Sequence, residues 1–111
     1  MRKIVISLIV IALSSPLAAT TWKGVTLMDA GCAAKKDVMA HPENHSKSCM
    51  MQCSKAGYGA VVDGKFVKFD KNGDKLAAAA LKKSAKKDHL RANIMGEMKG
   101  GTIHVSSMTL E

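Results

Sequence analysis

The sequence predicts an α+β domain, mainly of β-strands, in which five strands form an OB-fold-like barrel. Five segments alternate apolar and polar residues or are rich in β-branched side chains, as strands are. A lysine- and alanine-rich segment before the last two strands has the apolar spacing of a helix. A segment with all three cysteines follows the first strand. The order strand, Cys/His insertion, hairpin, helix, hairpin is that of an OB-fold.

Residues 1–19 are predicted to be a cleavable signal peptide. A basic start precedes an apolar run from Ile4 to Leu13, and small residues lead to the predicted cleavage site after Ala19. This apolar run is about half as long as a membrane-spanning helix requires. We therefore expect a periplasmic or secreted protein without stable membrane insertion, in which residues 20–111 form a single OB-like domain.

The chain is basic, with 17 Lys and Arg against 9 Asp and Glu and a net charge of +8. Loss of Arg2 and Lys3 with the signal peptide lowers this net charge to +6. The lysines are scattered, and four of them lie on the outer face of the predicted helix, which favours a solvated surface over a site for an anionic partner. Export and the few aromatic residues argue against nucleic acid as a partner. The composition indicates no particular oligomeric state.

The first three strands are predicted over residues 21–29, 59–62 and 65–70. Val25 and Leu27 alternate with polar neighbours in the first of them. The second and third strands form a hairpin, because Asp63-Gly64 is typical of a two-residue turn in which both residues have positive φ.

A helix and a second hairpin complete the predicted domain. Asp74 is expected to cap a helix that extends to about Lys87. The buried stripe of this helix is predicted to consist of Leu76, Ala77, Ala80, Leu81 and Ser84. The last two strands span residues 89–98 and 102–110, and the apolar face of the first contains Leu90, Ala92, Ile94 and Met98. A change of alternation at Ser106-Ser107 predicts a β-bulge.

The insertion, residues 30–57, contains the densest group of soft metal ligands, namely Cys32, His41, His45, Cys49 and Cys53. A helix is expected from Ser46 to Lys55, and the steps of four from His45 through Cys49 to Cys53 place these side chains on one helical face. Cys32 approaches from the preceding loop in this hypothesis. Three thiolates and one imidazole make a tetrahedral site of the kind used for structural zinc, and thiolates also bind Cu(I). His41 is the reserve ligand.

A disulfide is the alternative interpretation of the same cysteines. An exported protein meets an oxidising compartment, where a cysteine pair usually oxidises. A bond from Cys32 to Cys49 or to Cys53 would join the loop to the helix and stabilise the fold by about 3 kcal/mol. Cys49 and Cys53 on one helical turn are geometrically less suited to a bond. One thiol then remains unpaired. A thiol redox protein is a third interpretation, which the missing Cys-x-x-Cys motif disfavours.

The sequence offers no motif that predicts an enzyme. It contains no nucleophile motif, no phosphate-binding glycine loop and no recognisable pair of catalytic carboxylates. Asp70, Asn72 and Asp74 resemble the start of a calcium loop, but Gly73 and Leu81 stand where the loop needs other residues. We therefore expect a binding protein without catalytic activity.

The chain resembles a group of small exported bacterial proteins of uncharacterised function. The resemblance lies in Trp22-x-Gly24, Asp29-x-x-Cys32, the run from His45 through Cys49-x3-Cys53 to Gly57, and Asp63-Gly64-Lys65. It covers most of the chain after the signal peptide. It implies an OB-like β-domain in a bacterial envelope and a common role for the three cysteines, and it implies no activity.

The sequence thus leaves two functional hypotheses. The first is a periplasmic or secreted protein that binds zinc or copper through a Cys3His site of Cys32, His45, Cys49 and Cys53, for a structural purpose or for metal handling. The second is a disulfide-stapled OB-like module, without metal, that binds a protein or glycan partner on its barrel face.

Overall fold

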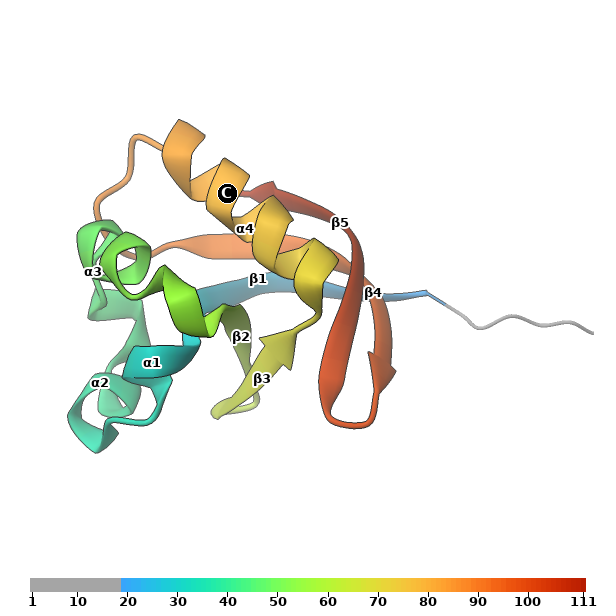
Figure 1. The fold of residues 1–111 in the computed structure, drawn as a ribbon, viewed down its shortest axis with the longest axis horizontal. Coiled ribbons are helices and arrows are strands. Elements are labelled where there is room, and N and C mark those ends of the chain that lie inside the picture. Colours follow the sequence, from blue (N-terminus) through green and yellow to red (C-terminus); the bar gives the residue numbers. More distant parts are fainter. Residues whose placement is uncertain (1–18) are drawn as a thin grey trace, which may run out of the picture.

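The computed structural model describes residues 19–111, so the first eighteen residues of the predicted signal peptide lie outside the described part of the chain. The described chain is an α+β domain built on five strands (Figure 1). Its elements are, in order, β1 (Thr20–Asp29), α1 (Ala30–Ala33), α2 (Lys36–Ala40), the 3-10 helix η1 (Pro42–Asn44), α3 (Lys47–Gln52), the 3-10 helix η2 (Ser54–Ala56), β2 (Tyr58–Val62), β3 (Lys65–Phe69), α4 (Lys71–Lys83), β4 (Arg91–Lys99) and β5 (Thr102–Leu110). The predicted five strands and their order are confirmed.

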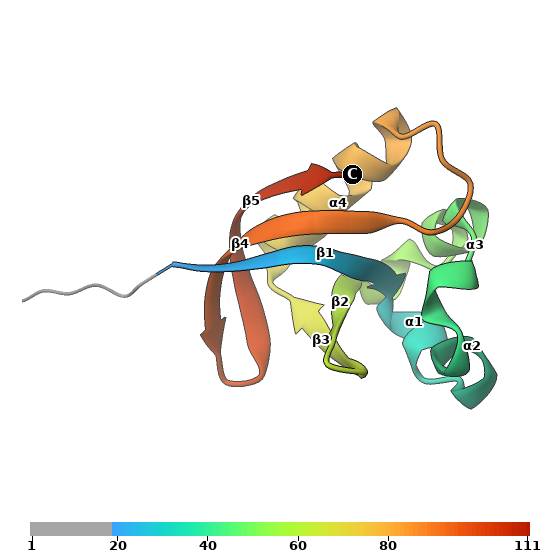
Figure 2. The same ribbon diagram turned by 180° about the vertical axis from the view of Figure 1, so that it is seen from behind.

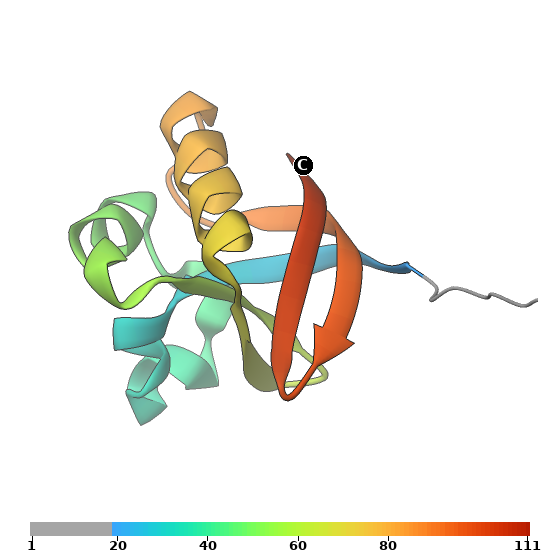
Figure 3. The same cartoon turned by 45° about the vertical axis from the view of Figure 1, so that its right-hand side comes forward.

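The sheet closes on itself in the strand order β1-β2-β3-β5-β4. Figure 2 shows β4 lying between β1 and β5, with antiparallel pairing on both sides. The ring closes between β3 and β5, which are parallel and share two residue pairs, Lys68 with Thr102 and Phe69 with Ile103. Helix α4 also packs against β5 (Figure 3). The helices α1 to α3 gather at the end of the sheet where β1 ends (Figure 1).

Two local predictions in the hairpins are confirmed. Asp63 and Gly64 have φ values of 52° and 78°, as the two-residue turn requires. In the second hairpin, Met95 pairs with Ser107 but Gly96 pairs with Val105, so Ser106 is the extra residue of a β-bulge.

The core lies inside the sheet and under α4. Its buried members are Leu27, Met50, Tyr58, Ala60, Phe69, Ala77, Leu81, Leu90, Ala92, Ile94, Ile103 and Val105. The predicted inward face of β4 is correct for Leu90, Ala92 and Ile94 but wrong for Met98, which is 46 % exposed. Met98 is the last residue but one of β4 and lies close to the Gly100-Gly101 turn, at the end of the sheet.

The predicted boundaries of the helix after β3 are wrong at both ends. Asp70, not Asp74, caps α4, and its Oδ1 accepts a hydrogen bond of 2.9 Å from the Gly73 amide. Asp74 lies in the first turn, where its Oδ1 accepts a hydrogen bond from the Tyr58 amide. The helix ends at Lys83 instead of Lys87, because Ser84 adopts an extended conformation. The next strand begins at Arg91, so the predicted start at residue 89 is also two residues early.

Asp70 also connects α4 to the sheet, since its Oδ1 accepts a second hydrogen bond from the Val105 amide. Asp70→Ala leaves both backbone donors without this acceptor, and we expect it to lower the free energy of unfolding by about 1–3 kcal/mol. Asp70→Asn keeps the Oδ1 acceptor and is expected to retain most of the stability. Urea denaturation of both variants measures the difference, and equal stability of Asp70→Ala and wild type would contradict this role.

Candidate metal centre

Asp29 lies at the centre of the site, where β1 ends and α1 begins. Pairing with Tyr58 of β2 fixes its backbone, and its side chain has no exposed surface. It is the N-cap of α1, and its Oδ2 accepts a hydrogen bond of 2.8 Å from the Cys32 amide. This cap holds a buried carboxylate and the Cys32 thiol on the same turn of chain.

The His45 imidazole reaches the same carboxylate from the other side of the insertion. Its Nε2 lies 2.8 Å from Asp29 Oδ1, and its side chain is 8 % exposed. The loop between α4 and β4 holds this segment on both sides of His45. The Glu43 carbonyl accepts from the His89 amide, and the Lys47 amide donates to the Lys87 carbonyl.

Asp29, Cys32 and His45 form a group of potential metal ligands. One ligand atom from each lies within 4.8 Å of the other two. In a tetrahedral zinc site with bonds of about 2.0–2.3 Å, ligand atoms lie about 3.3–3.8 Å apart, so small side-chain movements would complete the geometry. A metal at His45 Nε2 would replace the proton that this nitrogen shares with Asp29. The sequence placed Asp29 in a motif with Cys32 but did not predict it as a ligand.

Cys53 supplies a second sulfur beside this group. Its Sγ lies 4.0 Å from Cys32 Sγ. The residue is the C-cap of α3, and its amide donates to the Cys49 carbonyl. The sulfur separation is close to the spacing of two zinc-bound thiolates and about 2 Å longer than a disulfide bond. All three cysteines are free in this structure, and the pair is compatible with either chemistry.

Cys49 and His41 lie outside the group of Asp29, Cys32 and His45. The Cys49 side chain is exposed on α3, and its amide donates to the Ser46 hydroxyl that caps this helix. Because Ser46 is the cap, His45 precedes the helix, so the predicted stacking of His45, Cys49 and Cys53 on one helical face is wrong. His41 ends α2 and lines, with His45, a surface hollow of about 280 Å³.

The electrostatics of the site keep the Cys32 thiol protonated when no cation is near. Burial raises the pKa of Cys32 to about 11, and the negative charge of Asp29, its hydrogen bond and the nearby Cys53 act in the same direction. Burial and the charge of Asp29 also raise the pKa of Tyr58. A bound cation reverses this trend, because a metal-coordinated thiol is deprotonated.

In the part of the chain that the structure describes, no helix has the length and apolar character needed to cross a membrane. Comparison of the chain with protein-family models, with curated proteins and with solved structures finds no match. The chemistry of the site is therefore inferred from its own residues.

The raised pKa of Cys32 predicts the order in which the three thiols react. In reduced, metal-free protein at pH 8, the Cys32 thiol is almost entirely protonated, because burial raises its pKa to about 11. We expect iodoacetamide to alkylate the exposed Cys49 first and Cys32 last, and the Cys32 rate to rise as the pH approaches 11. Peptide mapping after timed quenching measures each rate. Alkylation of Cys32 as fast as Cys49 at pH 8 would contradict this environment.

Proposed function

We propose that this chain is an exported, periplasmic or secreted, metal-binding protein whose site consists of Cys32, His45, Asp29 and Cys53. The observation that carries the proposal is the convergence of a buried carboxylate, a thiol and an imidazole within 4.8 Å. Cys53 Sγ, which lies 4.0 Å from Cys32 Sγ, is the proposed fourth donor. The proposal changes the predicted Cys3His set by placing Asp29 in the site and Cys49 outside it.

The donor set favours zinc over copper. Two sulfurs, one nitrogen and one carboxylate oxygen suit the borderline character of Zn²⁺, whereas Cu(I) prefers sulfur ligands alone. The fully buried Asp29 carboxylate is compatible with a bound cation, which would add to the compensation that the Cys32 amide and the His45 imidazole provide. Cys32 is also almost fully buried, which is more typical of a structural site than of one that exchanges its metal.

The surrounding architecture supports a stapling role within an OB-like fold. The closed strand order with a parallel β3–β5 pair, and the helix between β3 and β4, follow the OB pattern. In this fold the Cys/His insertion occupies the loop between β1 and β2. A metal on Asp29, His45 and Cys53 joins the end of β1 to the segment before α3 and to the C-cap of α3. It would thus close a loop that contains no long helix or strand.

Zinc binding by matched serine variants tests this ligand set. We expect one zinc per chain in wild-type protein purified from the periplasm, measured by elemental analysis and by competition with a chromophoric chelator. Cys32→Ser, His45→Ala and Cys53→Ser should each weaken zinc binding by at least about tenfold. Cys49→Ser is the matched control, because Cys49 lies on α3 outside the group, and its affinity should equal wild type.

Two results would contradict the proposal in different ways. Loss of zinc in Cys49→Ser with retention in Cys53→Ser would show that the sulfur ligands are wrongly assigned. Absence of zinc and copper from the wild-type protein, with no uptake after reduction, would exclude metal binding itself. Asp29→Asn tests the contribution of the carboxylate charge separately, because the amide oxygen of asparagine can still cap α1. Weaker zinc binding with unchanged helix content would then result from the lost charge.

The sulfur pair also favours a second candidate, a disulfide-stapled module for a protein or glycan partner. Rotation of the Cys32 and Cys53 side chains would bring sulfurs that are now 4.0 Å apart to bonding distance. This candidate predicts an intact mass about 2 Da below that of the reduced chain, no bound metal, and a single reactive thiol at Cys49. Alkylation of all three thiols in unfolded, metal-free protein without added reductant would exclude it.

A further inference from the structure

The second half of β5 has one free edge. β5 pairs with β3 at Thr102 and Ile103, and the rest of the strand pairs with β4 alone. A hydrogen bond of 2.9 Å from the Glu111 amide to the Arg91 carbonyl continues the β4–β5 ladder and sets its phase. Because hydrogen-bonded positions alternate in an antiparallel pair, the N–H and C=O groups of Met108 and Leu110 point to the opposite edge.

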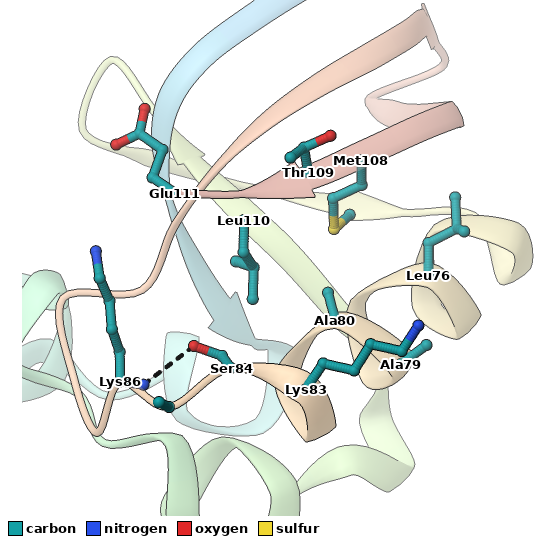
Figure 4. A pocket seen from close by; sticks show the side chains of 11 residues that line it. Leu76, Ala79, Ala80, Lys83, Ser84, Lys86, Met108, Thr109, Leu110 and Glu111 are labelled. Atoms are coloured by element: carbon teal, nitrogen blue, oxygen red, sulfur yellow. Dashed lines mark hydrogen bonds between the residues drawn. The ribbon is translucent and has the colours of Figure 1, made fainter.

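A groove of about 580 Å³ lies between this edge and α4. In Figure 4, Met108 and Leu110 point from β5 toward Leu76 and Ala80 of α4, so the floor of the groove is apolar. Lys83 and Lys86, from the end of α4 and the following loop, line its rim. Within residues 19–111, no backbone group pairs with Met108 or Leu110 from the side of the groove.

We propose that this groove binds an extended acidic peptide segment of another protein, which adds to the free edge of β5 as a further strand. Main-chain hydrogen bonds to Met108 and Leu110 hold the peptide, as in other cases of β-strand addition. Alternate side chains of the peptide then point toward α4, where apolar residues contact Leu76 and Ala80. Acidic residues of the peptide pair with Lys83 and Lys86 at the rim.

Charge favours an acidic peptide of another protein over the other segments that could cover the free edge of β5. A second copy of the chain would bring its own lysines to the groove, and the net charge of +6 after loss of the predicted signal peptide opposes such pairing. The basic start of the chain, with Arg2 and Lys3, has the same disadvantage. The acidic residue among those lining the groove, Glu111, points away from its floor in Figure 4 and lies beside Gly24. The groove therefore offers apolar surface and positive charge to an acidic strand.

Fluorescence anisotropy with a labelled peptide of alternating glutamate and valine tests this site. We expect saturable binding by the zinc-loaded wild-type protein, and no binding of the matched lysine–valine peptide. The double variant Lys83→Glu, Lys86→Glu should weaken binding by at least about tenfold, since it reverses the charge of the rim. Lys75→Glu, Lys82→Glu changes the net charge equally on exposed α4 residues outside the groove, and should bind within about threefold of wild type.

Two further measurements test strand addition itself. Two peptides that are N-methylated at alternate residues, one at the odd and one at the even positions, each lose the hydrogen-bond donors of one edge. The peptide that is methylated on the edge facing β5 should lose binding, and the other should retain it. In ¹⁵N spectra, the amides of Met108 and Leu110 should shift more than that of Thr109. Equal binding by both double variants, equal effects of the two methylation patterns, or a concentration-dependent dimer whose interface includes β5 would each overturn the proposal.

Discussion

The buried carboxylate of Asp29 is the interaction on which the Cys/His insertion depends. It ends β1, caps α1 through the Cys32 amide and hydrogen-bonds to His45, and it has no exposed surface. A negative charge in this position is stable only if donors or a cation surround it. The chain from residue 30 to residue 57 contains only short helices, and it is anchored by this carboxylate and by Met50, which is buried in the core.

Local patterns were sufficient to predict the strands and their turns, because alternation and turn residues act over a few positions. The irregularity at Gly24 was not predicted: its φ of 62° and the hydrogen bond from its amide to the distant Asn93 Oδ1 accompany a shift of pairing between β1 and β4. The N-cap of α4 was not predictable in this way. Asp70 and Asp74 are equivalent in the local sequence, and bonds to distant strands assign their roles, to Val105 for Asp70 and to Tyr58 for Asp74.

In the candidate metal centre, too, some residues were predictable from local sequence and others depended on distant contacts. Cys32 and His45 were predicted as ligands from their residue types, and the structure brings them together. Asp29 was missed because its role depends on burial, which the pairing of β1 with β2 creates and which the spacing Asp29-x-x-Cys32 alone does not reveal. The helical stacking of His45 failed because Ser46 caps α3, and a serine before a helix competes with any extension of that helix toward the N-terminus.

The loop between α4 and β4 connects the candidate metal centre to the groove. Its Lys87 carbonyl accepts from the Lys47 amide and its Ser84 carbonyl from Lys47 Nζ, so the segment after His45 holds the loop in place. Ser84 and Lys86 of the same loop line the groove. The same loop thus contributes backbone contacts to the segment that carries His45 and side chains to the groove.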